Sequence, residues 1–369
     1  MNLLIHGPGM IATHLPASHP LKPTRANDAH DLIANPRNGW VELVQVVAPP
    51  TATDRDVARV HDLSYIAMVD RLSVPGATGR VPSGEARRFG FSAQGDNPPY
   101  AEMGLIARNV SGGVIHAIEQ VASGNADLAF VPSAGVNHHA MPGSASGFGI
   151  FNDAAVGIAW ARERGMRVMY VDLDVHQGDG VEAMFASDPQ VLTISIHEST
   201  RFLFPGPPGG LANAIGTGPG TGFAVNVPLA PYSDDNTWLW AFEEIVPPLH
   251  GAFRPDLTVV QCGADAYHAD PLAHLLLSEN AYVRAAERLR SLTGGRLVAI
   301  GGGGYDVEAT PRIWASMFAT FAGLQVNDNW LHGPNPTPSL DAGASSRVMD
   351  DARGAIDTLK QLVFPIHGL

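Results

Sequence analysis

Residues 167–179 read RVMYVDLDVHQGD, and this stretch decides the class of fold. Its first seven residues form a nearly continuous apolar, β-rich run. Such a run is typical of a strand buried on both faces of a parallel sheet. The run leads directly into a group of reactive side chains: Asp172, Asp174, His176 and Asp179.

Five further runs have the same apolar, β-rich character, and helix-like stretches lie between most of them. The predicted strands are Glu42–Val47, Leu128–Val131, Val191–Ile196, Leu257–Gln261 and Arg296–Ile300. The predicted helices are Asn109–Ser123, Asn152–Arg164, Asn236–Phe253, Glu279–Leu292 and Pro311–Leu324. Strands that alternate with helices predict an α/β layered fold.

The chain has 369 residues, which is long enough for two domains, yet we expect one domain over residues 1–369. No internal repeat and no flexible Ser- or Gly-rich linker divides it. The segment Pro205–Gly222 is rich in glycine and proline, and we predict an ordered surface loop there. The tail that follows Gly333 is polar and proline-rich, and it ends in a short helix-like segment.

Charge and cysteine content exclude several classes of function. The 23 Lys and Arg residues against 36 Asp and Glu residues give a net charge of −13, which argues against a nucleic-acid partner because phosphate binding needs a basic face. The single cysteine, Cys262, excludes an internal disulfide and a thiolate-rich zinc site, and we expect it to be buried. Because no signal peptide and no apolar run of about 18 residues is recognisable, we expect a soluble cytoplasmic protein without a membrane partner.

Polar, site-like residues follow five of the six predicted strands. In an open α/β sheet the ligand crevice lies outside the carboxyl ends of the strands. We therefore expect these segments to meet in one pocket. They are 135–139 (GVNHH), 172–179 (DLDVHQGD), His197, 262–265 (CGAD) and 301–305 (GGGGY).

Asp174, His176 and Asp265 are the predicted metal ligands. Carboxylates and an imidazole are costly to bury unless something positive lies among them, and a divalent metal ion fits. Three protein ligands with an open fourth position are the pattern of catalytic zinc, and iron(II) or manganese suit these donors nearly as well. The alternative is a hydrogen-bonded strand end with solvated carboxylates.

His138 and His139 are candidates for proton transfer, because neutral imidazole titrates at about pH 6.5. Asp172 and Asp179 are available to bind the far ring nitrogens and to orient the rings. Tyr305 follows a glycine run that lacks the lysine of a phosphate-binding loop, and its phenol suits hydrogen bonding to a developing oxyanion. The alternative for the two histidines is a loop pair without a role.

Phe148 and Phe204 lie beside glycines, in SGFG and FLFPG. This setting suits the walls of a narrow apolar channel. Ordinary core aromatics are the alternative, and the pattern alone does not separate the two.

Seven motifs occur in order within the part of the chain between about residues 19 and 324. They are HHAMPGSASGFGIFND (138–153), DLDVHQGDG (172–180), TISIHES (193–199), FPG (204–206), VNVPL (225–229), QCGADAYHADPLAHL (261–275) and GGGGY (301–305). With these motifs the chain resembles the zinc-dependent histone deacetylase superfamily, and it is most similar to the bacterial acetoin-utilisation deacetylases. The resemblance implies a single-domain arginase/deacetylase-type fold, with a mainly parallel eight-stranded sheet and helices on both faces. It also implies hydrolysis of acetyl-lysine-type amides, with an acetylated lysine of a protein or peptide as substrate, and it leaves the oligomeric state open.

The resemblance also implies roles for individual residues. Asp174, His176 and Asp265 match the zinc ligands. His139 matches the general base and acid, and His138 matches a neighbour that supports charge in the transition state. The remaining catalytic matches are Asp172 and Asp179 as carboxylate partners and Tyr305 as the oxyanion donor.

Further matches concern the channel and a second ion. A structural K⁺ or Na⁺ is implied beside the metal loop, and Arg25 loosely matches an arginine of an internal cavity. Leu272 stands where polyamine-selective relatives have a glutamate. The absence of an acidic residue there argues against a cationic polyamine as substrate. The channel matches are Asp96 at the rim, Gly147, Phe148 and Phe204. The matches for the monovalent cation are Asp172, Asp174, His176, Ser195 and Ile196.

Three positions depart from the family pattern. Gln177 replaces a usual histidine, Gly149 a usual cysteine, and Asn137 a glycine or aromatic residue. None of these positions is a matched ligand, base or oxyanion donor, so we expect an active enzyme whose properties are tuned.

Three rival functions remain. An acetylpolyamine or other small acyl-amide hydrolase stays open. A dimanganese amidinohydrolase of the arginase type is disfavoured by Gly178, because that chemistry commonly has a carboxylate two residues after the histidine. A module that only binds acyl groups is disfavoured by the intact His139 and Tyr305.

Overall fold

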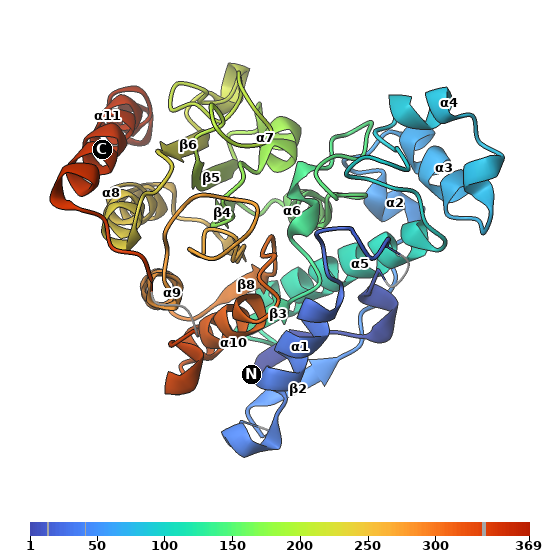
Figure 1. Ribbon diagram of the computed structural model, residues 1–369, viewed down its shortest axis with the longest axis horizontal. Helices are drawn as coiled ribbons and strands as arrows, with labels where there is room; N and C mark the ends of the chain where they lie inside the picture. The colour runs from blue at the N-terminus through green and yellow to red at the C-terminus, as the bar shows by residue number, and fades with distance from the viewer. Residues whose placement is uncertain (13–14, 41, 334–336) are drawn as a thin grey trace.

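Eight parallel strands form one sheet within the residues that the computed structural model describes, which are 1–12, 15–40, 42–333 and 337–369 (Figure 1). Their order is β2-β1-β3-β8-β7-β4-β5-β6. The predicted α/β fold with a parallel eight-stranded sheet is therefore confirmed. The strands are β1 Asn2–Ile5, β2 Val44–Val47, β3 Leu128–Val131, β4 Val168–Asp172, β5 Val191–Glu198, β6 Ala224–Leu229, β7 Leu257–Gln261 and β8 Leu297–Ile300.

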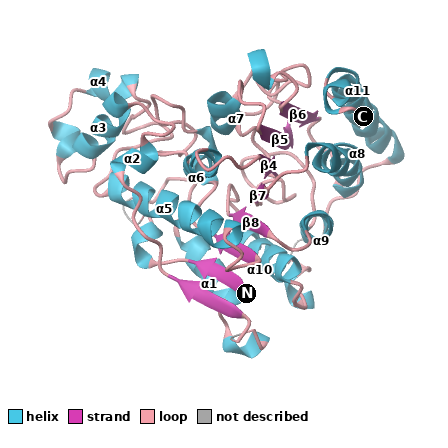
Figure 2. Ribbon diagram, turned by 180° about the vertical axis from the view of Figure 1, so that it is seen from behind, coloured by secondary structure: helices cyan, strands magenta, loops and turns pink. Residues whose placement is uncertain are grey.

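Helices cover both faces of the sheet, as predicted (Figure 2). On β4, Met169 and Val171 point into the core on one face, while Val168 and Tyr170 point into the core on the other. This explains the continuous apolar run, because successive side chains of a strand face opposite sides and both sides are buried here. The first face is covered by α1 (Thr24–Ile33), α8 (Asp235–Phe253), α9 (Glu279–Thr293), α10 (Ala309–Ala322) and α11 (Ala342–Leu362), and the second by α5 (Met103–Ala122), α6 (Asp153–Arg162) and α7 (Asp179–Phe185).

A third apolar cluster lies beside the sheet. It joins α2 (Asp54–Val57), α3 (Leu63–Leu72) and α4 (Ser83–Arg88) to α5 through buried side chains such as Tyr65 and Met103. These three helices and α11 lie at opposite ends of the longest axis of the molecule (Figure 1). None of the helices in the described ranges combines the length and the apolar composition that a membrane span requires.

All six predicted strands are present, and two further strands, β1 and β6, were not predicted. β1 has only four residues, too few for a clear pattern. In β6, Asn226 and Pro228 interrupt the apolar run. β6 tolerates this proline because it is an edge strand, where the missing N–H donor is not needed by a neighbour.

All five predicted helices are present, and α5 begins before its predicted start at Asn109. The C-terminal helix, α11, has 21 residues and is not short. Residues 205–222 form a loop, as predicted. Its only helical element is the 3₁₀ turn Gly218–Gly220. Positions 334–336 of the predicted polar tail lie outside the described residues.

Candidate metal centre and active site

The carboxyl ends of five neighbouring strands form one site. β3, β8, β7, β4 and β5 are adjacent and parallel, so their carboxyl ends lie side by side. Asp172, the last residue of β4, is in register with Ser195 of β5 and Gln261 of β7. The five polar segments that follow the predicted strands therefore meet at one edge of the sheet.

Three buried side chains converge as a candidate metal site. His176 Nδ1 lies 3.2 Å from Asp174 Oδ1 and 3.1 Å from Asp265 Oδ2. One ligand atom from each of the three residues lies within 4.8 Å of the other two. One nitrogen and two carboxylate oxygens fit a single zinc or iron(II) ion. The alternative of solvated carboxylates is wrong, because Asp174 and Asp265 are 1% and 0% exposed.

Hydrogen bonds hold both carboxylates in place. Gln261 Nε2 and the backbone N–H of Gly303 donate to Asp174 Oδ2 at 2.6 Å and 2.7 Å. The backbone N–H of Val175 donates to Asp265 Oδ1 at 2.9 Å. Only glycine fits at position 303, because a Cβ there would lie 2.0 Å from Asp265 Oδ2. These donors bind one oxygen of each carboxylate, and the other oxygen of each lies near His176 Nδ1.

The electrostatics of this group favour a positive charge. Burial and the negative charge of Asp174 raise the pKa of Asp265 to about 6. Burial lowers the pKa of His176, but its hydrogen bonds to Asp174 and Asp265 outweigh burial and raise that pKa to about 10. Two buried carboxylates need a positive partner, and a bound cation would supply it.

Each of the paired histidines is bound to its own carboxylate. His138 Nδ1 lies 2.9 Å from Asp172 Oδ2, and His139 Nδ1 lies 2.6 Å from Asp179 Oδ1. The hydroxyl of Tyr170 also donates to Asp172 Oδ2, at 2.8 Å. The ring centroids of the two histidines are 4.0 Å apart. The expected pairing of each histidine with a carboxylate is therefore present.

The pKa values of the two histidines shift in opposite directions. Burial lowers the pKa of His139, and the neighbouring His138 lowers it further, to about 4. Burial also lowers the pKa of His138, but the charges of Asp174 and Asp172 outweigh burial and raise it to about 9. This environment favours a neutral His139 beside a protonated His138.

Aromatic rings and a glycine enclose the space beside His139. The ring of Phe204 lies against His139 at 4.8 Å and nearly perpendicular, and Phe148 lies 5.8 Å from the ring of Tyr305. A Cβ at Gly147 would lie 2.4 Å from His139 Cδ2. Phe204 is 39% exposed and Phe148 is half-buried, so neither is an ordinary core residue.

Tyr305 is held mainly through its backbone. Its N–H donates to Asp270 Oδ2 at 2.7 Å, and the preceding carbonyl of Gly304 accepts from Arg25 Nη1 at 2.8 Å. Burial raises the pKa of Tyr305 well above its ordinary value, and the nearby carboxylates add to this effect. A phenol that keeps its proton remains a hydrogen-bond donor.

Asp96 and Leu272 lie around this group. The side chain of Asp96 is exposed, and its carbonyl accepts from His19 Nε2 at 3.1 Å. The ring of His19 lies 4.7 Å from Phe148. Leu272 is half-buried, and its N–H donates to Asp270 Oδ1 at 2.9 Å. Asp96 is thus joined to the site through His19, and Leu272 through Asp270.

Ser195 and Ile196, expected at a monovalent cation, lie on β5 beside the metal loop. Ser195 Oγ accepts from the backbone N–H of Gly178 at 3.4 Å and lies 3.0 Å from His197 Nδ1. Ile196 is fully buried. Ser195 is in register with Asp172 of β4, and the role of Ser195 and Ile196 with an ion stays a prediction.

Two residues that sequence reasoning missed hold the histidine loop. Asn152 caps α6, since its Oδ1 accepts from Ala155 N at 3.0 Å, and its Nδ2 donates to the carbonyl of His138 at 3.1 Å. His61 lies 3.0 Å from the carbonyl of Met141 through Nδ1, and its Nε2 accepts from the N–H of Asn152. The helix start at Asn152 was a usable N-cap signal, whereas His61 had none.

Asp153 is a third missed residue, and it explains one departure from the family pattern. The carboxylate accepts from Asn137 Nδ2 at 2.5 Å and from the N–H of Gly135 at 2.8 Å. Asn137 Oδ1 in turn accepts from the N–H of Ile150. Asn137 therefore ties the histidine loop to the start of α6.

The other two departures lie away from the ligand atoms. Gln177 Nε2 donates to Glu182 Oε2 at 2.8 Å, so its amide is directed to α7. A Cβ at Gly149 would lie 3.0 Å from Asn137 Cα and 3.0 Å from the carbonyl of Ser146. Position 149 is therefore tightly packed in this chain. Cys262 is fully buried, as predicted.

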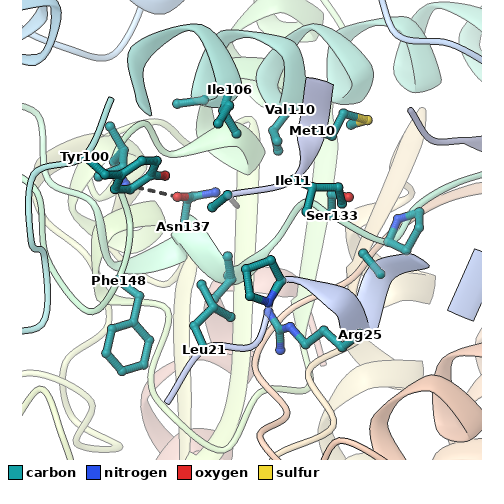
Figure 3. Close-up of a pocket in the computed structure, with 17 residues that line it drawn as sticks. Met10, Ile11, Leu21, Arg25, Tyr100, Ile106, Val110, Ser133, Asn137 and Phe148 are labelled. Carbon is teal, nitrogen blue, oxygen red and sulfur yellow. Dashed lines mark hydrogen bonds between the residues drawn. The ribbon is translucent and has the colours of Figure 1, made fainter. Parts of the chain in front are cut away.

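A small pocket of about 70 Å³ lies next to this site (Figure 3). Arg25 lines it, where the resemblance implies the arginine of an internal cavity. Ser133 and Phe148 are also among its lining residues, and Ser133 Oγ has no hydrogen-bond partner among the described residues. The pocket is thus mainly apolar, with a few polar groups.

Comparison with known proteins gives one family and a consistent set of relatives. Residues 19–321 match the model of the histone deacetylase domain. The "Acetoin utilization protein AcuC" of Bacillus subtilis (strain 168) is 34% identical over 340 residues, which cover 89% of this chain and 85% of the relative. The protein of that name from Staphylococcus xylosus is 31% identical over 304 residues, 79% of this chain and 77% of its own. The protein of that name from Staphylococcus aureus (strain MRSA252) is 32% identical over 319 residues, which cover 85% of this chain and 79% of the relative.

Proposed function

The chain belongs to the histone deacetylase family, and from this premise we propose that it is a metal-dependent deacetylase of acetyl-lysine-type amides. The proposed substrate is an acetylated lysine side chain of a protein or peptide. The observation that carries the proposal is the buried group of Asp174, His176 and Asp265 beside two histidine–carboxylate pairs. A zinc or iron(II) ion held by these three residues would polarise the amide carbonyl and lower the pKa of a water molecule to about 7.

His139 is the proposed general base and acid. Its Nδ1 is bound to Asp179, and no hydrogen bond within the described part of the chain uses its Nε2. This nitrogen can take a proton from the attacking water and later return it to the leaving lysine amine. His138, bound to Asp172, would support the charge that develops in the transition state.

Tyr305 is the proposed oxyanion donor. Its ring lies at the channel beside Phe148, and its raised pKa keeps the hydroxyl proton in place. A phenol so placed can donate a hydrogen bond to the tetrahedral oxygen. The loss of one such donor typically lowers kcat by about 10²–10³.

The channel residues support a lysine-like substrate. Gly147, Phe148 and Phe204 would enclose the methylene groups of the side chain, and the exposed Asp96 would bind the substrate backbone. The half-buried Leu272 gives this channel an apolar residue where an acidic one would select a cationic polyamine. Acetylated polyamines are therefore the second candidate substrates, not the first.

A structural K⁺ or Na⁺ is proposed beside the metal group. Asp172 and Ser195 are neighbours in register on β4 and β5, which supports a shared ion. The residues proposed for it are Asp172, Asp174, His176, Ser195 and Ile196.

One divalent ion per chain fits this site better than the two of an arginase-type enzyme. A carboxylate at position 178 has no room, because a Cβ there would lie 2.3 Å from Asp172 Oδ2. A second ion would use His138, Asp172 and Asp174, which also lie close enough to share one. The lack of room for a carboxylate at position 178 is therefore the observation that favours a single divalent ion. Metal analysis should therefore find one divalent ion per chain.

A deacylation panel tests the proposal. Metal-depleted protein is reconstituted with zinc or with iron(II) and offered acetyl-lysine peptides, longer acyl-lysine peptides and acetylated polyamines. We expect the highest kcat/KM on an acetyl-lysine peptide. Tight binding of these peptides without turnover would instead support a module that only recognises acyl groups. Preferential hydrolysis of a polyamine would overturn the substrate assignment alone.

A further inference from the structure

The peptide unit between Gly304 and Tyr305 is held at both of its polar groups. Its carbonyl accepts from Arg25 Nη1 at 2.8 Å, and its N–H donates to Asp270 Oδ2 at 2.7 Å. The carbonyl and the N–H lie in one rigid plane. Arg25 and Asp270 are 5% and 6% exposed, so both hydrogen bonds are largely shielded from water. This plane cannot turn without breaking at least one of them.

The glycines before Tyr305 make this restraint necessary. Gly302 and Gly304 have φ values of 152° and 132°, a conformation that residues with a side chain rarely adopt. A Cβ at Gly304 would also lie 2.6 Å from Thr310 Oγ1. Because the glycines have no side chains to pack, the backbone that leads into Tyr305 is held by hydrogen bonds.

The second oxygen of Asp270 reaches the channel wall. Asp270 Oδ1 accepts from the N–H of Leu272 at 2.9 Å. The backbone N–H of Asp270 itself donates to the carbonyl of Tyr267. A single carboxylate therefore joins the segment that carries Tyr305 to the segment that carries Leu272.

We propose that Asp270 is a positioning residue that sets the place of Tyr305 relative to the channel wall. The inference rests on the proposed function of Tyr305 as oxyanion donor. Such a donor must lie about 2.7–3.1 Å from the developing oxyanion. A misplacement of about 1 Å lowers the rate by roughly 10²-fold. Asp270 thus acts on the rate through Tyr305, and among the described residues its carboxylate makes no hydrogen bond to the three metal-site side chains.

The first variant is Asp270→Asn. In the wild type the two carboxylate oxygens accept from the backbone N–H groups of Tyr305 and Leu272. Asparagine keeps one acceptor oxygen and turns its NH₂ group toward one of these two N–H groups, so one of the two hydrogen bonds is lost. We expect kcat to fall roughly 10- to 100-fold, with the metal content unchanged. KM should stay within about threefold, because the loss appears in the transition state and not in substrate binding.

Asp235→Asn is the matched control. Asp235 Oδ1 accepts from the backbone N–H of Ser278 at 2.8 Å, and Oδ2 accepts from its hydroxyl. It therefore anchors a nearby segment to α8 in the same way, with no hydrogen bond to Tyr305 among the described residues. We expect lower thermal stability and an unchanged kcat for this variant.

A double-mutant cycle separates positioning from a general structural role. The hydroxyl is absent in Tyr305→Phe, so the double variant with Asp270→Asn should be no slower than Tyr305→Phe within about twofold. If the two losses multiply, Asp270 acts by another route and the proposal fails. It also fails if Asp270→Asn, folded and loaded with metal, keeps the wild-type kcat.

Hydrogen–deuterium exchange tests the tether without turnover. In Asp270→Asn the amide that loses its acceptor, that of Tyr305 or that of Leu272, should exchange faster than in the wild type, while Asp235→Asn should affect the Ser278 amide instead. Unchanged exchange at both Tyr305 and Leu272 would overturn the proposal. A wild-type protein that is inactive on the whole panel would refute the deacetylase function, and exchange at these two amides would then decide the role of Asp270.

Discussion

His139 and Gly147 are in such close contact that the smallest side chain would disturb them. A Cβ at position 147 would lie 2.4 Å from His139 Cδ2, and the φ of Gly147 is +49°. The variant Gly147→Ala should therefore displace the proposed base and lower kcat by roughly 10²-fold. Steady-state kinetics on an acetyl-lysine peptide measures this.

Gly165→Ala is the control for that substitution. Gly165 also has a positive φ, of +79°, but no atom lies within 4 Å of its Cβ position. The backbone strain alone should lower the free energy of unfolding by about 1–2 kcal/mol and leave kcat unchanged. Equal effects of both variants on kcat would show that contact with His139 is unimportant.

The proposed chemistry makes a second prediction at single residues. His139→Ala removes the proposed base, and Tyr305→Phe removes the proposed oxyanion donor. Each should lower turnover at least about 100-fold while the protein stays folded. Circular dichroism and metal analysis serve as controls, and near-normal rates in metal-loaded samples would contradict the assigned roles.

His61 makes a pH-dependent contribution to stability. Burial lowers its pKa to about 4, from 6.5 in an exposed histidine, although carbonyls of Pro142 and Met141 oppose this. As the pH falls from 6.5 toward 4, the unfolded chain takes up a proton that the folded chain does not. The contribution of His61 is therefore complete above pH 6.5 and is lost across this window, by up to roughly 3 kcal/mol.

The variant His61→Gln isolates this effect, because glutamine does not titrate. The free energy of unfolding of the wild type should fall relative to that of the variant as the pH is lowered through the window. Urea unfolding at a series of pH values measures the difference. A difference that does not vary with pH would mean that His61 does not carry the effect.

Among the helices, α11 depends on one apolar stripe. Its buried residues are Val348, Ala352, Ile356 and Leu359, spaced as one face of a helix. Ala352, Ile356 and Leu359 of this stripe pack in the core cluster that includes strands β5 and β6 and helix α8. The sequence contains this spacing, and a search for it would have predicted a long helix there.

Ile356→Ala tests the contribution of this element. The loss of a buried isoleucine should lower the free energy of unfolding by about 2–5 kcal/mol and leave kcat unchanged, because α11 contributes no residue to the proposed site. Asp357→Ala, at an exposed neighbouring position, should change stability by no more than about 0.5 kcal/mol. Denaturant unfolding compares the two, and a similar effect of both would contradict the packing argument.

Across the whole molecule, the metal group joins the ends of two strands that lie far apart in the sequence. Asp174 and His176 follow β4, and Asp265 follows β7. Removal of the metal with a chelator should therefore abolish activity and also lower Tm, because two buried carboxylates lose their positive partner. Zinc or iron(II) should restore both properties.

Asp265→Asn provides the control for metal removal. The variant lacks one ligand and should bind metal weakly, so the chelator should change its Tm little. Differential scanning calorimetry of both proteins, with and without chelator, makes the comparison. A wild-type Tm that is insensitive to the chelator would contradict a metal held by these residues.

The sequence by itself determined the layered α/β architecture and the set of reactive residues. Buried parallel strands need continuous apolar runs, and this local pattern correctly predicted six of the eight strands. Residues that follow strand ends could be identified in the same way, as Asp174 and Tyr305 were. β1 was not predicted because a run of four residues is too short to show a pattern. β6 was not predicted because Asn226 and Pro228 interrupt its apolar run.

Only the tertiary structure decided which atoms face one another. Asp270, Asp153 and His61 act on segments distant in the chain, and hydrogen bonds between distant segments leave no local pattern in either one. The order of the strands placed five of their ends side by side, and no single run of residues contains that order. Hydrophobic periodicity is a property of neighbours along the chain, whereas a site is a property of neighbours in space.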